Sequence, residues 1–396
     1  MTGQDALVAD LGRIKAALER RPGAARAGDG AVDALAAIFG LSAFERDVLL
    51  LCAGVELDSE IAEACATANG DGARRFATFG LALAVLDGAH WSALAPGSPL
   101  RRWQLVELTD PSVTAGALRV DERILHHLTG VDYLDPRLDG ILEAGAVAPL
   151  AASQVAVARR AAELLDAADP PARAALCGGD PSARRAVAAD AARRLGLGIL
   201  AVRADALPAE IEPLGRLCAR EAALTGSVLV VECRDGEGDP ARAAAVERFV
   251  DRLPAAVLTS SRDPLPGLDR PGPRVDVARP THDEQRDLWL DALGERGAAL
   301  DGGIDALVSQ FDLEAGAIAR IAAVHDGFDE VWHQCRAAGR PRLDDLAQRI
   351  EPAAGWEDLV LPAAQRDTLR QIAAQVRARA VVHHRWGFAA SSLFGT

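Results

Sequence analysis

The residues whose types and spacing could do chemistry lie between Ala174 and Ser261. An apolar run at 174–177 is followed by the glycine turn Gly178-Gly179 and then by an alternating apolar and basic segment at 183–195. This order of strand, tight glycine turn and helix start lets the amides at a helix N-terminus bind a phosphate. The stretch therefore predicts an α/β layout of the nucleotide-binding type.

The residues that do the chemistry in a P-loop are replaced here. The P-loop pattern is a glycine, four residues of any type, a second glycine, a lysine and a hydroxyl residue. Gly178 fits its first position, but Ala183, Arg184 and Arg185 stand at the last three. The lysine reaches the terminal phosphates and the hydroxyl ligates Mg²⁺, whereas a guanidinium is bulkier and cannot ligate a metal. Because the chain has a single lysine, Lys15, it contains no complete P-loop.

The next two predicted strands also end in residues at catalytic positions. The strand at 227–233 ends in Glu232 and Cys233, and the strand at 255–261 ends in Ser261. Glu232 stands where an aspartate supports Mg²⁺, and Cys233 stands where a glutamate orients the attacking water. With helices between them, these strands predict a parallel sheet whose ligand edge lies at the carboxyl ends of the strands. We predict that the nucleotide-binding fold is retained and that its catalytic residue types are not.

Length and composition limit the class of protein. At 396 residues the chain has room for two or three domains, and 49% hydrophobic with 25% charged residues is ordinary for a globular protein. No apolar stretch approaches the ~20 residues that span a membrane. The six cysteines lie far apart, mostly in apolar or helical runs. We therefore expect a cytoplasmic protein with reduced cysteines, no metal site and no membrane segment.

Patterning divides the chain into six segments. They are an N-terminal helix and linker at 1–30, a winged-helix-like domain at 31–135, a helical connector at 136–172, the α/β domain at 173–280, a helical lid at 281–350 and a further unit at 351–396. Capping boxes at Ser42 and Thr281 mark two helix starts. Alternation at 102–108, with a return strand at 117–120, predicts the β-wing. The predicted fold class is multidomain: a winged-helix-like domain, then a P-loop NTPase-like parallel sheet with a helical lid.

A winged helix suggests DNA binding, but the charge of this one opposes it. Residues 1–150 contain 13 Lys and Arg against 21 Asp and Glu, a net charge of −8 within a chain of −14. A recognition helix needs basic residues to bind phosphates. We therefore expect the domain to bind a protein partner or to pack within the molecule, and we keep a DNA-binding regulator as the alternative.

Several stretches of the chain resemble one bacterial family. They are Phe39 to Asp47, Gly80 to Trp91, Pro99 to Trp103 and Trp356 to Pro362. Together with the order of domains, they resemble AAA+ ATPases that carry an N-terminal winged-helix domain and accompany contractile injection or phage-tail-like systems. The resemblance covers nearly the whole chain. It implies ATP-driven remodelling of a protein assembly, homo-oligomers, and ATP with Mg²⁺ as cofactors of the full-length family.

The resemblance also assigns roles by position. It implies that 173–280 is a degenerate AAA+ domain, that Ser261 is the polar sensor after the fourth strand and that Arg320 is the lid arginine. It implies that 351–396 is the shortened start of a second, competent domain. On this interpretation the chain alone is inactive and its nucleotide fold is a scaffold or assembly module. A residual ATP-sensing module is a further alternative.

The end of the chain carries apolar side chains without the strands that would bury them. They follow Trp356, and several kcal/mol are forfeited when such side chains stay in water, at ~25 cal/mol per Å². We expect a helix at 365–379 and no fixed place for 383–396.

Overall fold

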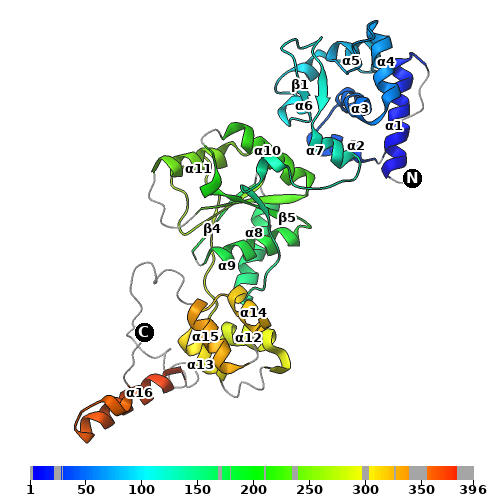
Figure 1. The fold of residues 1–396 in the computed structure, drawn as a ribbon. Helices are drawn as coiled ribbons and strands as arrows, with labels where there is room; N and C mark the ends of the chain where they lie inside the picture. The colour runs from blue at the N-terminus through cyan, green and yellow to red at the C-terminus, as the bar shows by residue number, and fades with distance from the viewer. Residues whose placement is uncertain are drawn as a thin grey trace.

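The computed structural model describes most of the chain. The described residues are 3–21, 28, 30–167, 172–178, 180–208, 211–233, 240–296, 303–324, 327–338 and 355–380. Figure 1 shows three bodies in a row: an N-terminal helical domain, a central sheet covered by helices, and a smaller helical group. None of the described helices is both long and apolar enough to cross a membrane.

The N-terminal domain consists of helices and a small β-wing. Its elements are α1 (Gly3–Leu18), α2 (Ala31–Phe39), α3 (Ala43–Leu57), α4 (Ser59–Asn69), α5 (Phe79–Val85), η1 (Trp91–Leu94), α6 (Pro99–Arg102), β1 (Val106–Leu108), β2 (Leu118–Val120) and α7 (Glu122–Leu128). Ser42 caps α3: its hydroxyl accepts from the Glu45 amide, and the Glu45 carboxylate accepts from the Ser42 amide. β1 and β2 pair antiparallel, with Val106 opposite Val120. The capping box and the wing are thus confirmed, the wing with shorter strands than the pattern predicts.

Helix α1 belongs to the core of this domain. It packs against α3 and α4, and its Leu11 and Ile14 lie in the same buried cluster as Leu49 of α3. A buried ion pair supports the packing, because Arg46 of α3 donates to Asp10 of α1 at 2.5 Å. The helix that the sequence places in a separate segment at 1–30 is therefore part of the winged-helix domain.

The central domain is a six-stranded sheet between two layers of helices. Its elements are η2 (Pro136–Leu138), β3 (Leu142–Ala144), α8 (Ala152–Ala167), β4 (Arg173–Cys177), α9 (Pro181–Arg194), β5 (Gly198–Arg203), η3 (Ala204–Ala206), α10 (Glu212–Leu224), β6 (Ser227–Glu232), α11 (Pro240–Arg252), β7 (Val257–Ser261) and β8 (Arg274–Asp276). The strand order is β3-β5-β6-β7-β4-β8, and all neighbours run parallel except β3, which pairs antiparallel with β5. The chain leaves β4 toward one edge of the sheet and later passes it to form β8. The turn after β4 therefore lies at a switch point, where ligands bind in such sheets.

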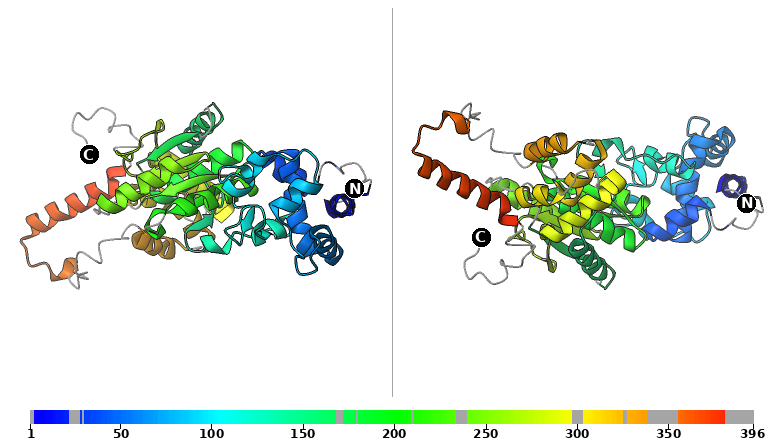
Figure 2. Two further views of the ribbon diagram at one scale, coloured as in Figure 1. Left: turned by 90° about the horizontal axis from the view of Figure 1, so that it is seen from above. Right: turned by 90° about the horizontal axis from the view of Figure 1, so that it is seen from below.

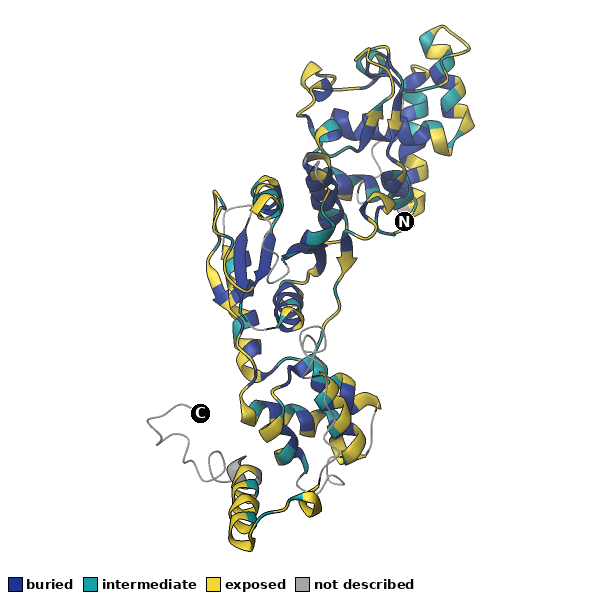
Figure 3. Ribbon diagram, turned by 60° about the vertical axis from the view of Figure 1, so that its left-hand side comes forward, coloured by how far each residue is buried: buried dark blue, intermediate teal, exposed yellow. Residues whose placement is uncertain are grey.

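Side chains of the inner strands are buried alternately on the two faces of the sheet. In β6, Val228 and Val230 join the core under α8 and α9, whereas Leu229 and Val231 join the core under α10 and α11. Figure 3 shows these strands as buried, as expected for a parallel sheet covered on both faces. The predicted parallel sheet is confirmed. The connector at 136–172 differs from the sequence prediction, because it contributes the edge strand β3 as well as α8.

The helices after the sheet form a separate small core. They are α12 (His282–Leu293), α13 (Gly303–Gln310), α14 (Ala315–Val324) and α15 (Phe328–Ala338), and they pack around the buried Trp289. Thr281 caps α12 in the predicted box with Glu284. The predicted order of a winged-helix-like domain, a mostly parallel sheet covered by helices and a group of helices after it is confirmed.

A last helix projects from the lid. After η5 (Trp356–Asp358), α16 (Ala363–Ala380) extends away from the other helices in Figures 1 and 2, and its Leu369, Ile372 and Val376 are exposed. The helix predicted at 365–379 is confirmed. The expectation for 383–396 lies outside the described residues.

Candidate functional site

The turn after β4 has the shape of a phosphate-binding turn, but a carboxylate lies at the helix that follows it. Gly178 has a φ of +77°, a left-handed conformation that favours glycine; Gly179 lies outside the described residues. Asp180 caps α9, and its Oδ1 accepts from the Ser182 amide at 2.8 Å. A helix N-terminus attracts anions, and at α9 the anion is the carboxylate of Asp180.

Arg184, at the position of the P-loop lysine, points into the protein. Its side chain is 0% exposed. Its Nε donates to Ser260 Oγ at 2.9 Å, and its Nη1 donates to the Gly178 carbonyl at 2.6 Å. The guanidinium therefore ties the turn to the end of β7 and does not extend outward toward a ligand.

Arg185 and Glu232, at the two positions that would support Mg²⁺, bind each other. The Nε and Nη2 atoms of Arg185 each lie 2.5 Å from a different carboxylate oxygen of Glu232, which makes a bidentate ion pair. Glu143 of β3 lies 3.6 Å from Arg185. The hydrogen bond to Glu232 raises the pKa of Arg185, so the cation is permanent. These residues do not fit Mg²⁺, because the Glu232 carboxylate that would ligate the ion is already paired with the positively charged Arg185.

The other predicted site residues do not form a reactive group. Ala183 is buried in the core under α8 and α9. Cys233 is half-buried, and its amide donates to the Ser260 carbonyl at 2.9 Å. Ser261 donates its hydroxyl to the Asp263 carbonyl at 2.7 Å, so the residue of β7 that meets Arg184 is its neighbour Ser260. Sequence reasoning chose the last hydroxyl of the strand and missed the one before it.

The lid places a further acid near the turn. Glu314, just before α14, is 7% exposed, and burial raises its pKa, with a further contribution from the charge of Asp180. Arg279 lies 3.7 Å from Glu314, but it also donates to Asp312 at 2.8 Å. Arg320 is exposed on α14 and forms no hydrogen bond or ion pair with another described residue. Asp180 and Glu314 thus place two carboxylates near the turn, with Arg279 beside Glu314. In the described part of the chain, no cluster of His, Cys, Asp and Glu could hold a metal ion.

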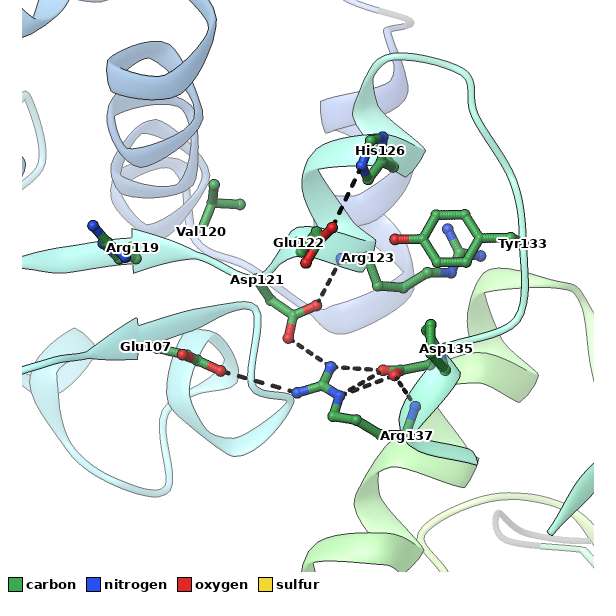
Figure 4. Close-up of a pocket in the computed structure, with 11 residues that line it drawn as sticks. Glu107, Arg119, Val120, Asp121, Glu122, Arg123, His126, Tyr133, Asp135 and Arg137 are labelled. Carbon is green, nitrogen blue, oxygen red and sulfur yellow. Dashed lines mark hydrogen bonds and ion pairs between the residues drawn. The ribbon is translucent and has the colours of Figure 1, made fainter. Parts of the chain in front are cut away.

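A concavity of about 550 Å³ lies beside the wing (Figure 4). Its polar side chains are largely paired with one another. Arg137 donates to Asp121 at 2.7 Å and to Asp135 at 2.6 Å, and the Arg123 guanidinium lies over the Tyr133 ring, 5.2 Å from its centre. Internal pairing of this kind indicates a structural junction.

Helix α10 extends this junction to the central domain. Arg220 and Glu221 are both 0% exposed. Arg220 donates to Asp135 and to the Gln104 carbonyl, each at 2.7 Å, and Glu221 accepts from Arg123 Nε at 3.3 Å. Buried charges thus join the winged-helix domain to the sheet domain.

The helix before the wing is short for a DNA-recognition helix. This helix, α6, has only four residues, two of which are Arg101 and Arg102. The segment between β1 and β2, at 109–117, contains Asp110 and neither Lys nor Arg. A recognition helix must present several side chains along the major groove, and its neighbours must bind phosphates. Four residues make about one turn of helix, too short for such a surface.

Comparison with known proteins identifies two parts of the chain. The family described as "Winged helix domain, variant" matches residues 2–142, and the "Contractile injection system ATPase helical domain" matches residues 281–341. No curated protein matches the chain in sequence.

Similar solved structures include Rhizobiales Trip13 (18% identity, TM-score 0.29, covering 51% of this chain and 90% of that one). They also include C. elegans PCH-2 (10% identity, TM-score 0.30, covering 49% and 67%). A third is the E. coli MS115-1 HORMA:CdnC:Trip13 complex (17% identity, TM-score 0.23, covering 51% and 86%). The two family matches thus cover separate parts of the chain: residues 2–142 match a variant winged helix domain, and residues 281–341 match the helical domain described for contractile injection system ATPases.

Proposed function

We propose that this is a contractile injection system AAA+ ATPase family protein whose described sheet domain is a scaffold and not a nucleotide switch. The observation that carries the proposal is the Arg185–Glu232 ion pair, in which the two positions that would support Mg²⁺ satisfy each other. The inward direction of Arg184 and the capping role of Asp180 support the same conclusion. The groups that would meet a nucleotide are engaged inside the protein.

The energetic cost of freeing these groups is large. Arg184 would have to give up its hydrogen bonds to Ser260 and Gly178 before it could reach a phosphate. A hydrogen bond to a charged group is worth about 1.5–3 kcal/mol. Losing two such bonds therefore lowers affinity by roughly 100-fold or more.

In the assembled protein, the winged-helix domain would bind a protein partner. The sheet and lid would pack against neighbouring subunits or another ATPase domain. The shared task would be ATP-driven remodelling of a protein complex. The acidic winged-helix domain, with its very short α6, supports a protein partner over a nucleic acid.

We expect ATP binding to be weak and insensitive to Mg²⁺, because Arg185 replaces the hydroxyl ligand. Isothermal titration calorimetry with and without Mg²⁺ measures this. A double variant, Arg185→Thr with Glu232→Asp, is the matched control because it restores both Mg²⁺-supporting residue types. Micromolar, Mg²⁺-enhanced affinity in the unaltered protein would contradict the proposal and favour an ATP-sensing module.

We expect no complex with duplex DNA in a gel shift at moderate salt, because the winged-helix domain repels phosphates. A repeat at low salt separates weak non-specific attraction from sequence readout, since non-specific binding falls steeply with salt. A complex that persists at moderate salt and prefers one sequence would favour the DNA-binding regulator.

A further inference from the structure

The first turn of α8 is hydrogen-bonded to the lid through Ser153. Its amide donates to Glu284 Oε1 at 2.6 Å, and its hydroxyl donates to Glu284 Oε2 at 3.0 Å. Amides in the first turn of a helix have no partner inside the helix. Glu284 also accepts from the Thr281 amide at 2.9 Å, at the start of α12. One carboxylate thus caps two helices, one from each side of the junction between sheet domain and lid.

Gln154 makes a second connection, and this one is buried. Its side chain is 1% exposed. Its Nε2 donates to Glu314 Oε2 and to the Ala278 carbonyl, each at 3.2 Å, while its Oε1 accepts from the Ala151 amide at 3.1 Å. Both polar atoms of the amide are therefore used, and two of their three partners lie after the sheet.

The charge on Glu284 strengthens the first connection. Burial opposes that charge, but the hydrogen bonds from Thr281 and Ser153 outweigh it and lower the pKa of Glu284. The carboxylate therefore stays ionised at neutral pH, and hydrogen bonds to an ionised acceptor are about twice as strong as neutral ones.

We propose that these two connections, Ser153–Glu284 and Gln154–Glu314, form a lid latch that fixes the orientation of the lid relative to the sheet without nucleotide. The contacts are made entirely by protein groups and bridge α8 to α12 and to the start of α14. They use none of the side chains of Arg184, Arg185 and Glu232. The proposed latch therefore needs no contact with a nucleotide to hold the lid, and it goes beyond the proposed function.

Distance measurement between spin labels on the full chain tests the latch. Arg159→Cys on α8 and Asp291→Cys on α12 place labels at exposed positions. Cys233→Ser removes the half-buried thiol, and the other five cysteines are buried. We expect one narrow distance distribution that Mg²⁺ and ATP leave unchanged. In the Glu284→Ala, Gln154→Met variant, we expect the single narrow peak to be lost.

Thr281→Ala is the matched control. It removes the hydroxyl that caps α12 but leaves Glu284 bound to Ser153, so the narrow peak should remain. A second label pair, Arg159→Cys with Arg248→Cys on α11, lies within the sheet domain and reports its integrity. If the distance distribution of this second pair also broadens in the double variant, the sheet domain itself is disturbed. The milder variant Ser153→Ala then tests the latch, because it removes a single hydrogen bond and should still widen the lid distribution.

Three results would overturn the latch. They are a broad lid distribution in the unaltered protein, a distance that shifts with ATP, and a narrow peak that survives loss of the latch contacts. Micromolar, Mg²⁺-enhanced binding of ATP in the calorimeter, with an unchanged lid distance, would refute the scaffold proposal alone. The two ideas therefore fail separately.

Discussion

Purified protein is expected to release phosphate from ATP no faster than the uncatalysed background. The P-loop lysine, its hydroxyl neighbour and the water-orienting glutamate are replaced by Arg184, Arg185 and Cys233. Removing a single group that stabilises the transition state costs about 10²–10³ in rate, and an arginine finger is worth about 10³–10⁵ in phosphoryl transfer. A phosphate-release assay with and without Mg²⁺ measures the outcome.

The matching variant is Arg184→Ala. Mg²⁺-dependent turnover that this change abolishes would show that the domain is an active enzyme and that our assignment is wrong. Turnover that the variant retains in full would come from a contaminating ATPase. Arg193→Ala, later on the same helix and paired there with Asp190, controls for a general effect of losing an arginine from α9.

Arg220→Ala is expected to lower the free energy of unfolding by about 3–5 kcal/mol, the usual cost of breaking a buried ion pair. Arg220 is fully buried, and its loss leaves Asp121 and Asp135 at the junction without one of their cations. Arg137 remains beside both acids, which favours the lower end of that range. Urea unfolding followed by tryptophan fluorescence measures the change.

Arg216→Ala provides the control on the same helix. Arg216 is exposed and forms no hydrogen bond or ion pair with another described residue, so we expect a change within about 0.5 kcal/mol. Arg220→Lys should fall between the two, because an ammonium keeps the charge but cannot reproduce the planar fork. Equal effects of Arg220→Ala and Arg216→Ala would show that the junction is not held by its charges.

Much of the fold could be predicted because its buried strands and helix caps produce recognisable patterns in short stretches of sequence. Buried parallel strands read as continuous apolar runs, and the capping boxes at Ser42 and Thr281 fix two helix starts. Strand β5 also has such an apolar run at 199–202, although it is not among the strands predicted from the sequence. Edge strand β3 has only three residues, too few to show the alternation of apolar and polar residues that marks a strand.

The candidate site residues could be selected from the sequence, but their contacts could not. That Arg184, Arg185 and Glu232 replace catalytic residue types stays a prediction from the sequence. Their pairing depends on the carboxyl end of β6 meeting α9, 47 residues away. The choice between Ser260 and Ser261 depends on which face each side chain takes, since neighbours along a strand point to opposite faces.

The buried charges of α10 could not be found in the same way. Arg and Glu on an amphipathic helix normally mark the solvent face. At Arg220 and Glu221 the winged-helix domain covers that face, and its partner residues Gln104, Arg123 and Asp135 come from far earlier in the chain. Only tertiary structure brings them together.

Helix α10 also has a mechanical consequence. One side of it packs on the sheet through Leu214, Leu217 and Cys218, while Arg220 and Glu221 are bound to the winged-helix domain. A force that separates the winged-helix domain from the sheet domain therefore acts on these side-chain contacts as well as on the backbone at 129–141. The load enters α10 and passes through it to β6, the strand that carries Glu232. Tension on the winged-helix domain would therefore reach the sheet at the strand whose carboxyl end carries the Arg185–Glu232 ion pair.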